Sequence, residues 1–355
     1  MRKYVDYLDY IASIGAGLKP LDFPDPHHSL DRTAASERIL IWNGANDWQN
    51  PKGKGGPNYL TTGAGPLVTM AGWYHCANIV SKTAKILGMA SDGEKYAAMA
   101  KDIARRTNEK FLNTTTGRYG NQEDNQTAQV LPLALGMVPS EIRLKTFQQL
   151  IETIHACKDH HNTGFVALPY LLQILAESPQ SELANRIVNQ QDYPSWKTLV
   201  HHGVLAEGWD GGGAQMPSCG GAVGMWLYQS VLGIRPDPAG PGFKKFILNP
   251  QPDPATGLTS AEGWYDSPYG RIVSNWKLVD GRISMDVTIP PNTQATVYVP
   301  VAPKPGEGGP AQAAAAVMES GKPAAQVDGV KFLKMENGSA VYEVGSGSYR
   351  FSASR

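Results

Sequence analysis

Residues 193–221 have the sequence YPSWKTLVHHGVLAEGWDGGGAQMPSCGG, which concentrates tyrosine, tryptophan, histidine and carboxylate side chains in one short span. Glu207 follows an apolar run and precedes a glycine-rich turn that contains Trp209 and Asp210. Glycines let a backbone approach a ligand closely, and a carboxylate can accept a proton or a hydroxyl hydrogen bond. This combination is typical of a loop that handles a sugar, although a surface loop with a capping acid and a buried Trp has the same composition.

The composition of the 355-residue chain limits the classes of partner. Lys and Arg number 32 and Asp and Glu number 32, so the formal net charge is zero. We therefore do not expect a nucleic-acid partner. Hydrophobic residues make up 41% of the chain, enough for a sizeable core. No apolar run approaches the ~20 residues of a membrane span, so no membrane partner is expected either.

The spacing of cysteines and histidines gives no sign of a metal site. Cys76, Cys157 and Cys219 are odd in number and far apart, which argues against a disulfide framework or a zinc site. The pair His27 and His28 has no third ligand placed nearby, so a solvated loop is the preferred interpretation. We predict neither a metal nor a cofactor.

Hydrophobic periodicity up to residue 235 predicts helices joined by loops, with almost no strand pattern. The predicted helices cover residues 2–14, 66–88, 95–111, 124–136, 141–156, 164–176, 181–190 and 221–232. Loops after alternate helices carry the polar and aromatic residues, including Asp47 with Trp48, His160 with His161, and the segment around Glu207. This distribution predicts a toroid of helical hairpins, in which one end of the barrel collects the active-site loops.

The pattern changes after Gly242 to short alternating segments. Those before residue 300 are expected at residues 246–249, 271–278, 282–289 and 295–299, and later ones at 329–334, 340–344 and 348–352. Asp280 and Gly281 join two of them as a type I′ hairpin turn. The segments predict an antiparallel β-sandwich of about seven or eight strands. We expect a helical domain over residues 1–238 and the sandwich over residues 239–355, an α+β multidomain chain.

Several motifs together resemble the α-L-rhamnosidases of glycoside hydrolase family 78. The resemblance is carried by the YPSW of residues 193–196, the AEGWD of 206–210, the NQTA of 125–128, the GMVP of 136–139, Asp47-Trp48, and the segments 233–236 and 270–276 that lead into a β-sandwich. It covers most of residues 35–300. The resemblance implies an (α/α)6 six-hairpin toroid followed by an antiparallel β-sandwich.

The same resemblance implies an inverting α-L-rhamnosidase that removes terminal α-L-rhamnose from plant or microbial glycans and glycosides. Its partner would be a rhamnose-containing oligosaccharide or glycoside. Inverting glycosidases hold an acid and a base about 6.5–9.5 Å apart, with room for a water between them. Glu207 would be the general base. The residues expected to bind substrate are Asp47, Trp48, Tyr193, Trp196, Trp209, Asp210 and His161.

The chain also departs from the family pattern. The family's general-acid Glu lies in an Asp-Cys-Pro-x-Arg-x-Glu segment, which would precede residue 1. We therefore expect the C-terminal part of a longer enzyme, with a toroid incomplete at its N-terminus that an upstream segment or a second chain completes. The first residues lack the apolar core of a secretory signal; a periplasmic or secreted location is expected only if the natural N-terminus lies upstream. Within the chain, Glu123 and Asp124 are the best acid candidates, although a helix cap is the preferred interpretation of these residues.

Three functional alternatives stay open at this point. A carbohydrate-binding relative without turnover would keep the aromatic loops and lack the acid. An interaction module would use an exposed barrel face to pair with another chain. An enzyme that acts on uronic-acid sugars would need a basic clamp for the carboxylate, for which residues 193–221 offer only Lys197.

Two further departures from the family pattern lie near Glu207. Met216-Pro217 replaces the Asn-His that follows the base loop in the family, and Ala206 and Gly208 flank Glu207 in place of the family's Trp and Arg.

Overall fold

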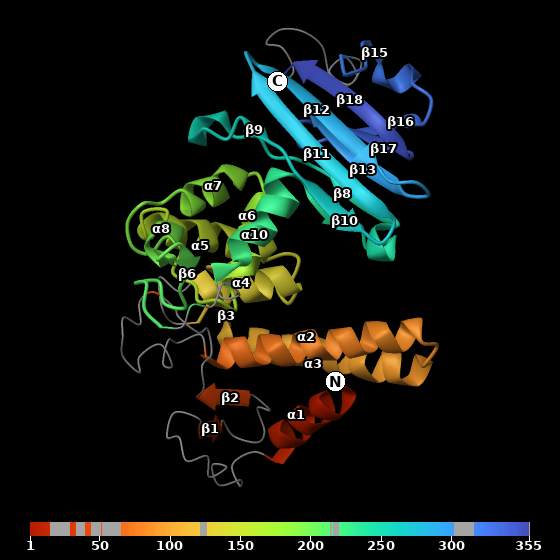
Figure 1. Cartoon of the computed structure of the whole chain (residues 1–355). Coiled ribbons are helices and arrows are strands. Elements are labelled where there is room, and N and C mark those ends of the chain that lie inside the picture. Colours follow the sequence, from red (N-terminus) through yellow and green to blue (C-terminus); the bar gives the residue numbers. More distant parts are fainter. Residues whose placement is uncertain are drawn as a thin grey trace. The chain divides into compact units, whose positions relative to one another are not determined.

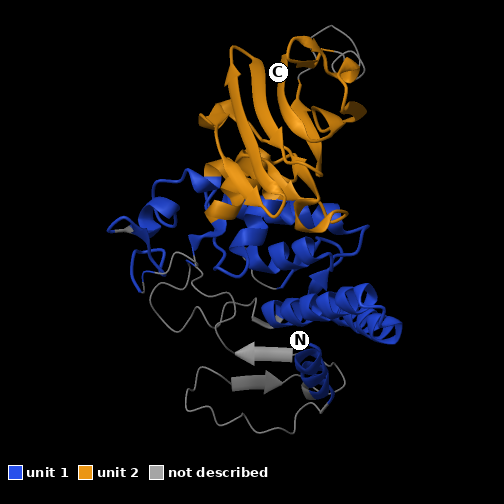
Figure 2. Cartoon of the chain, turned by 45° about the vertical axis from the view of Figure 1, so that its right-hand side comes forward, with its two compact units in different colours: residues 1–174, 187–222 blue, residues 175–186, 223–355 orange. Residues whose placement is uncertain are grey.

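The computed structural model describes residues 1–14, 29–32, 40–43, 51, 65–120, 126–213, 215, 220–301 and 316–354. The chain forms two compact units, shown in blue and orange in Figure 2. The first unit comprises residues 1–174 and 187–222, and the second comprises residues 175–186 and 223–355. Among the described residues, no helix is long and apolar enough to cross a membrane.

Helices dominate the chain up to residue 199 (Figure 1). They are α1 (Arg2–Ile14), α2 (Gly65–Ile86), α3 (Ala90–Phe111), α4 (Gln126–Leu135), α5 (Arg143–Ala156), α6 (Leu168–Ala176), α7 (Ser181–Val188) and α8 (Trp196–Leu199). Their bounds lie within a few residues of the ranges expected from periodicity, except for α8, which the sequence did not predict. A helix of one turn is too short to show a 3.6-residue repeat.

Short strand pairs connect the helices of the first unit. The pairs are β1 (Ser29–Arg32) with β2 (Leu40–Asn43), β3 (Leu112–Asn113) with β4 (Arg118–Tyr119), and β5 (Val200–His201) with β6 (Val204–Leu205). All three are antiparallel. The sequence did not predict them, because two to four residues are too few to show a period-two alternation.

The core of the first unit lies along the α2–α3 hairpin, which Figure 1 shows beside α1. Met70 and Trp73 of α2 pack with Tyr96 and Ile103 of α3, and all four side chains are fully buried. The Tyr96 hydroxyl donates to Asp6 of α1 at 2.8 Å, so this polar group has a partner at the edge of the core. Burying such side chains contributes roughly 1.5–3 kcal/mol each, which outweighs the weak propensity of any single residue.

The second unit contains two β-sheets. Neighbours in the larger sheet follow the order β10 (Trp264–Ser267), β11 (Gly270–Val279), β12 (Arg282–Ile289), β18 (Gly347–Ser354), β14 (Met318–Glu319) and β15 (Lys322–Pro323), with β9 (Ser260–Ala261) also paired to β11. The smaller sheet follows the order β16 (Val330–Glu336), β17 (Ser339–Val344), β13 (Gln294–Pro300), β8 (Lys245–Leu248) and β7 (Ile234–Pro236). The sheet pairs are antiparallel except β8 with β13, which run parallel.

The two sheets share one core. Tyr342 of β17 and Phe351 of β18 stack with ring centres 6.0 Å apart, and both are fully buried. Strand β12 alternates buried and exposed residues along most of its length, as expected for a strand with one face on the core. Asp280 and Gly281 form the β11–β12 turn with φ values of 48° and 69°, which confirms the predicted type I′ geometry.

The helical segment at the start of residues 223–355 is anchored to the larger sheet. Helix α10 (Ala222–Trp226) continues into the π-helical turn η4 (Leu227–Val231). The indole nitrogen of Trp276 donates to the Val231 oxygen at 2.7 Å, and the Ser274 hydroxyl donates to the Leu232 oxygen at 2.6 Å. Both bonds are buried, so they satisfy carbonyls at the end of the π-helical turn that have no partner within it.

Candidate active site

The segment that carries Glu207 begins with a capped helical turn. The backbone nitrogen of Thr198 donates to Oγ of Ser195 at 3.2 Å, and the backbone nitrogen of Ser195 donates to Oγ1 of Thr198 at 3.1 Å. These reciprocal bonds form a capping box, which stabilises the single turn α8 that carries Trp196. Ser195 of the Tyr-Pro-Ser-Trp motif is therefore the residue that caps this helical turn.

A tight hairpin connects this helical turn to Glu207. His202 and Gly203 turn between β5 and β6 with φ values of 50° and 80°, the left-handed values of a type I′ turn. The backbone nitrogen of Ala206 donates to the Leu199 oxygen at 2.9 Å, which returns the chain to the end of α8. Glu207 is the next residue, and it is half-buried.

The glycines after Glu207 form a compact turn around its carboxylate. The backbone nitrogen of Gly208 donates to the Gly212 oxygen at 2.9 Å, and that of Gly212 donates to Oδ1 of Asp210 at 3.1 Å. Gly213 has a φ of 79°, and a Cβ there would lie 3.1 Å from Oε2 of Glu207. A larger residue at this position would be strained and would crowd the carboxylate, so the turn needs glycine.

Trp209 sits in a buried aromatic cluster. Its ring centre lies 4.1 Å from that of His161 and 5.5 Å from those of Trp196 and Phe165. Trp196 meets Trp209 edge-on at 87°, a favourable arrangement for aromatic pairs. The indole nitrogen of Trp196 donates to the Gly220 oxygen at 3.0 Å. Because Trp209 is only 2% exposed, the cluster fixes the backbone on the C-terminal side of Glu207.

His161 is a neutral ring in this cluster. The residue is 1% exposed, and burial lowers the pKa of its imidazole to about 3. Neither ring nitrogen makes a hydrogen bond of good geometry to another described residue. The adjacent His160 differs, because its Nε2 lies 3.0 Å from Oδ1 of Asp192 and its Nδ1 faces backbone carbonyls. Both histidines are buried.

Gln126, the first residue of α4, holds the loop that carries His161. Its side-chain nitrogen donates to the His160 oxygen at 3.0 Å, and its side-chain oxygen accepts from the backbone nitrogen of Asn162 at 2.9 Å. The backbone nitrogen of Gln126 donates to Oδ1 of Asn162 at 3.2 Å. Gln126 is fully buried. Gln126 was not among the predicted site residues, because its role depends on partners that are distant in the sequence.

Tyr193 and Asp210 lie close enough to interact electrostatically. The Tyr193 hydroxyl donates to the Pro51 oxygen at 2.9 Å. Burial raises the pKa of Tyr193, and the negative charge of Asp210 raises it further. Asp210 itself is exposed. Tyr193 therefore stays a neutral hydroxyl that donates to the Pro51 oxygen.

The structure thus describes six of the predicted site residues, namely Tyr193, Trp196, Glu207, Trp209, Asp210 and His161. Ring contacts join His161, Trp196 and Trp209. Asp47, Trp48 and Glu123 lie outside the described residues. No group of three or more His, Cys, Asp or Glu side chains within the described part of the chain is placed to hold a metal ion.

A helical unit with aromatic and carboxylate loops, followed by a β-sandwich, is the architecture of a six-hairpin glycosidase with a C-terminal domain. A family model described as the bacterial alpha-L-rhamnosidase 6 hairpin glycosidase domain matches residues 27–231. A second, described as the bacterial alpha-L-rhamnosidase C-terminal domain, matches residues 233–314. The chain belongs to the bacterial α-L-rhamnosidase family, which confirms the predicted family and fold class.

Curated relatives and solved structures agree with this assignment. The chain is 29% identical over 289 residues to an α-L-rhamnosidase of Formosa agariphila and 29% identical over 323 residues to one of Streptomyces avermitilis. These matches cover 77% and 87% of this chain but only 30% and 28% of the relatives, so the chain spans less than a third of their length.

Two solved structures have the same fold at 27% sequence identity. The Streptomyces avermitilis α-L-rhamnosidase complexed with L-rhamnose gives a TM-score of 0.70 over 87% of this chain and 28% of that chain. The α-L-rhamnosidase from Dictyoglumus thermophilum gives a TM-score of 0.77 over 100% of this chain and 36% of that chain.

Replacing Gln126 by Ala is expected to loosen the loop that carries His161. The change leaves the His160 oxygen and the Asn162 nitrogen buried without their partner, at a cost of roughly 1–3 kcal/mol for each group. Native-state hydrogen exchange of the Asn162 amide should accelerate by about tenfold or more, since ~1.4 kcal/mol is a factor of ten. Gln148→Ala, at an exposed position of α5, is the matched control and should leave this exchange unchanged. Equal protection in both variants would contradict the clamp.

Replacing His161 by Phe is expected to reduce the loss of unfolding free energy that acidification causes. The folded-state pKa of about 3 lies below the value of ~6.5 in the unfolded chain. The stabilisation from a neutral His161 is therefore fully present above pH ~6.5 and is lost as pH falls toward ~3. Between pH 7 and pH 5 this linkage removes about 2 kcal/mol from the wild-type free energy of unfolding.

Urea unfolding at pH 7 and pH 5, followed by tryptophan fluorescence, measures that difference. The loss of stability on acidification should be about 2 kcal/mol smaller in His161→Phe than in the wild type. His155→Phe is the control, because His155 is an exposed histidine of α5. An unchanged loss in the His161 variant would show that this ring is protonated in the folded protein near pH 5.

Proposed function

We propose that this chain supplies the general base of a glycoside hydrolase that removes terminal α-L-rhamnose from glycans or glycosides. The observation that carries the proposal is the Glu207 carboxylate, half-buried at the end of a hairpin and enclosed by a glycine turn. The family membership and the similarity to a rhamnosidase solved with L-rhamnose support the sugar class. The Formosa agariphila and Streptomyces avermitilis rhamnosidases are longer than this chain, so the hydrolysis of rhamnosides is a proposal for this chain.

In the proposed reaction, Glu207 accepts a proton from a water molecule as the water oxygen attacks the anomeric carbon. A new carbon–oxygen bond forms on one face of the ring while the bond to the leaving group breaks on the other, which inverts the configuration. The leaving oxygen takes a proton from a general acid. Glu123 is kept as the proposed internal acid, although it lies outside the described residues.

The cluster beside Glu207 positions the base rather than contacting the sugar. Trp196 and Trp209 are only 7% and 2% exposed, so they fix the backbone next to Glu207. His161 is neutral and buried, so it adds no charge next to the base. Tyr193 and Asp210 offer a hydroxyl and a carboxylate for sugar hydroxyls, and Asp47 with Trp48 is proposed for the same task.

We also propose a division of the chain into a helical catalytic domain over residues 1–238 and a β-sandwich domain over residues 239–355. The change from helices to strands supports a division in this part of the chain, because η4 ends at Val231 and β7, the edge strand of the smaller sheet, begins at Ile234. The two family models meet at residue 232, a few residues before the proposed boundary.

Hydrolysis of p-nitrophenyl α-L-rhamnoside tests the proposed function. Nitrophenolate departs without protonation, so the assay depends on the base and little on the acid. The wild-type chain should release nitrophenol, and Glu207→Gln should lower kcat by roughly 10²–10⁴-fold because the amide cannot accept the proton.

Glu141→Gln serves as the matched control, since Glu141 is an exposed glutamate of the same unit. It should retain wild-type activity. The proposed role of Glu207 would be refuted by a folded Glu207→Gln variant with undiminished kcat. A folded wild type that releases no nitrophenol would show that these residues do not hydrolyse the rhamnoside, and would favour a carbohydrate-binding role.

A further inference from the structure

The outer face of the larger sheet carries one row of side chains across four strands. Trp264 of β10 pairs with Val273 of β11, Val273 pairs with Thr288 of β12, and Thr288 pairs with Ser348 of β18. Directly paired residues point to the same side of a sheet. Val287, the neighbour of Thr288, is buried, so this row faces away from the core.

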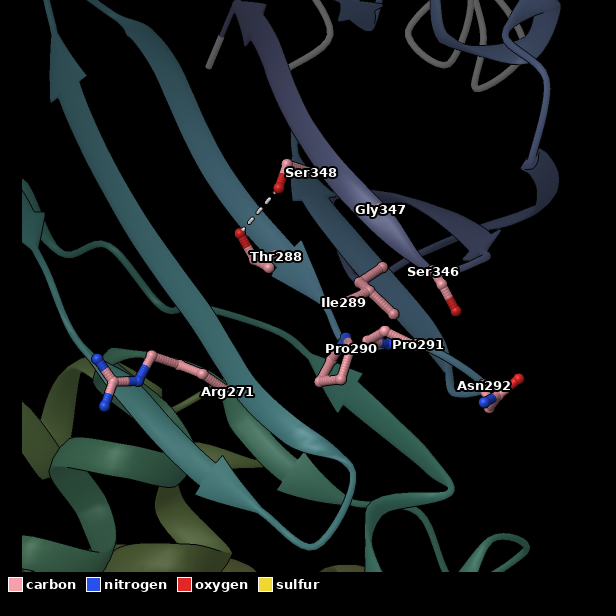
Figure 3. A pocket seen from close by; sticks show the side chains of 9 residues that line it. All are labelled: Arg271, Thr288, Ile289, Pro290, Pro291, Asn292, Ser346, Gly347 and Ser348. Carbon is pink, nitrogen blue, oxygen red and sulfur yellow. Dashed lines mark hydrogen bonds between the residues drawn. The ribbon is translucent and has the colours of Figure 1, made fainter.

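Two hollows lie along this row. The first has a volume of 580 Å³ and is lined by residues that include Arg271, Pro290, Thr288 and Ser348. The second has a volume of 390 Å³ and shares Thr288 and Ser348 with the first. Figure 3 shows the first hollow, with Thr288 and Ser348 joined by a hydrogen bond of 3.2 Å between neighbouring strands. Because the hollows share these two residues, they are neighbours on the same face of the sheet, and we call them together the outer-sheet groove.

Trp264 lies next to the outer-sheet groove, in contact with Arg271, one of its lining residues. Its side chain is 52% exposed. The guanidinium carbon of Arg271 lies 4.9 Å from its ring centre, a cation–π contact. Asp266 in turn holds Arg271 through bonds of 2.8 and 3.1 Å. A single exposed apolar residue is common on protein surfaces. A Trp ring held in place beside a groove is different, because binding to it costs little side-chain entropy.

The charges of the outer-sheet groove cancel in pairs. Its charged lining residues are Arg271, Asp286 and Arg350. Arg271 is paired with Asp266, and Nε of Arg350 donates to Oδ1 of Asp286 at 2.6 Å. Such pairs offer donors and acceptors without a field of one sign, which does not favour a polyanion. The complementary ligand is neutral and rich in hydroxyl groups.

We propose that the outer-sheet groove binds a neutral polysaccharide chain, with one sugar ring stacked on Trp264. The two adjacent hollows offer room for more than one linked sugar unit. Thr288 and Ser348 supply hydroxyls at its centre, and the Asp286–Arg350 pair supplies charged partners in the second hollow. That the bound polysaccharide contains rhamnose rests on the proposed function. The groove would hold the polymer from which the site at Glu207 removes terminal sugars.

Isothermal titration of a neutral rhamnan polysaccharide into the whole chain tests this proposal. The chain carries Glu207→Gln, so that the polymer is not consumed. Adding Trp264→Ala should weaken binding by about tenfold or more, the equivalent of one aromatic stacking contact of ~1.4 kcal/mol. Tyr10→Ala is the matched control, since Tyr10 of α1 is an aromatic residue of the first unit that is 57% exposed. It should bind as the parent does.

Three results would overturn the inference. They are equal affinity with and without Trp264, no binding of the polymer by the folded Glu207→Gln chain, and tighter Trp264-dependent binding of acidic polygalacturonate. With Glu207 intact, Trp264→Ala should hydrolyse the small aryl rhamnoside at the wild-type rate. Failure of that hydrolysis in the wild type would refute the proposed function alone, because Trp264-dependent binding of the polymer would still be measurable.

Discussion

The arrangement at Glu207 depends most on the hydrogen bonds of the Gln126 carboxamide. The carboxamide joins the start of α4 to the backbone on both sides of His161. His161 lies against Trp209, which is separated from Glu207 by one glycine. A single buried amide thereby connects two segments far apart in the sequence to the position of one carboxylate. Buried hydrogen bonds between a side-chain amide and the backbone suit this task. Any shift of the loop would leave buried polar groups with neither a protein partner nor water.

The cluster combines rigidity with an apolar interior. His161 contributes an aromatic ring without a charge, since burial lowers its pKa to about 3. Trp196 contributes a second ring, fixed by its bond to Gly220 and by the capping box of Ser195. Glycine at position 213 keeps the following turn from crowding the carboxylate of Glu207. Catalytic groups benefit from such support, because small displacements of a reacting group lower the rate strongly.

Local pattern predicted much of the fold. The long helices α2, α3 and α5 follow from hydrophobic periodicity, and the Asp280-Gly281 hairpin follows from turn chemistry. The β5–β6 hairpin, the π-helical turn η4 and the parallel pairing of β8 with β13 could not be predicted. Each is either too short to show a periodicity or is decided by contacts between distant strands.

The candidate site was predictable only where its residues lie close together in the sequence. Trp209, Asp210 and the glycines surround Glu207 within one loop, so the carboxylate could be singled out from that stretch. The contact of His161 with Trp209 and the clamp by Gln126 depend on tertiary packing. His161 was expected to bind substrate, whereas the structure places it among the rings and pairs the adjacent His160 with Asp192. A polar residue without a motif shows its role only when its partners are known.

Azide rescue of Glu207→Ala tests the central claim, that Glu207 is a general base, most directly. Azide is a nucleophile that needs no base, so it can replace the activated water in the space vacated by the carboxylate. The account predicts that azide restores release of nitrophenol from p-nitrophenyl α-L-rhamnoside and that the product is β-L-rhamnosyl azide, with inverted configuration. A folded, rhamnose-binding Glu207→Ala chain that azide does not reactivate, or that yields the α-azide, would contradict it.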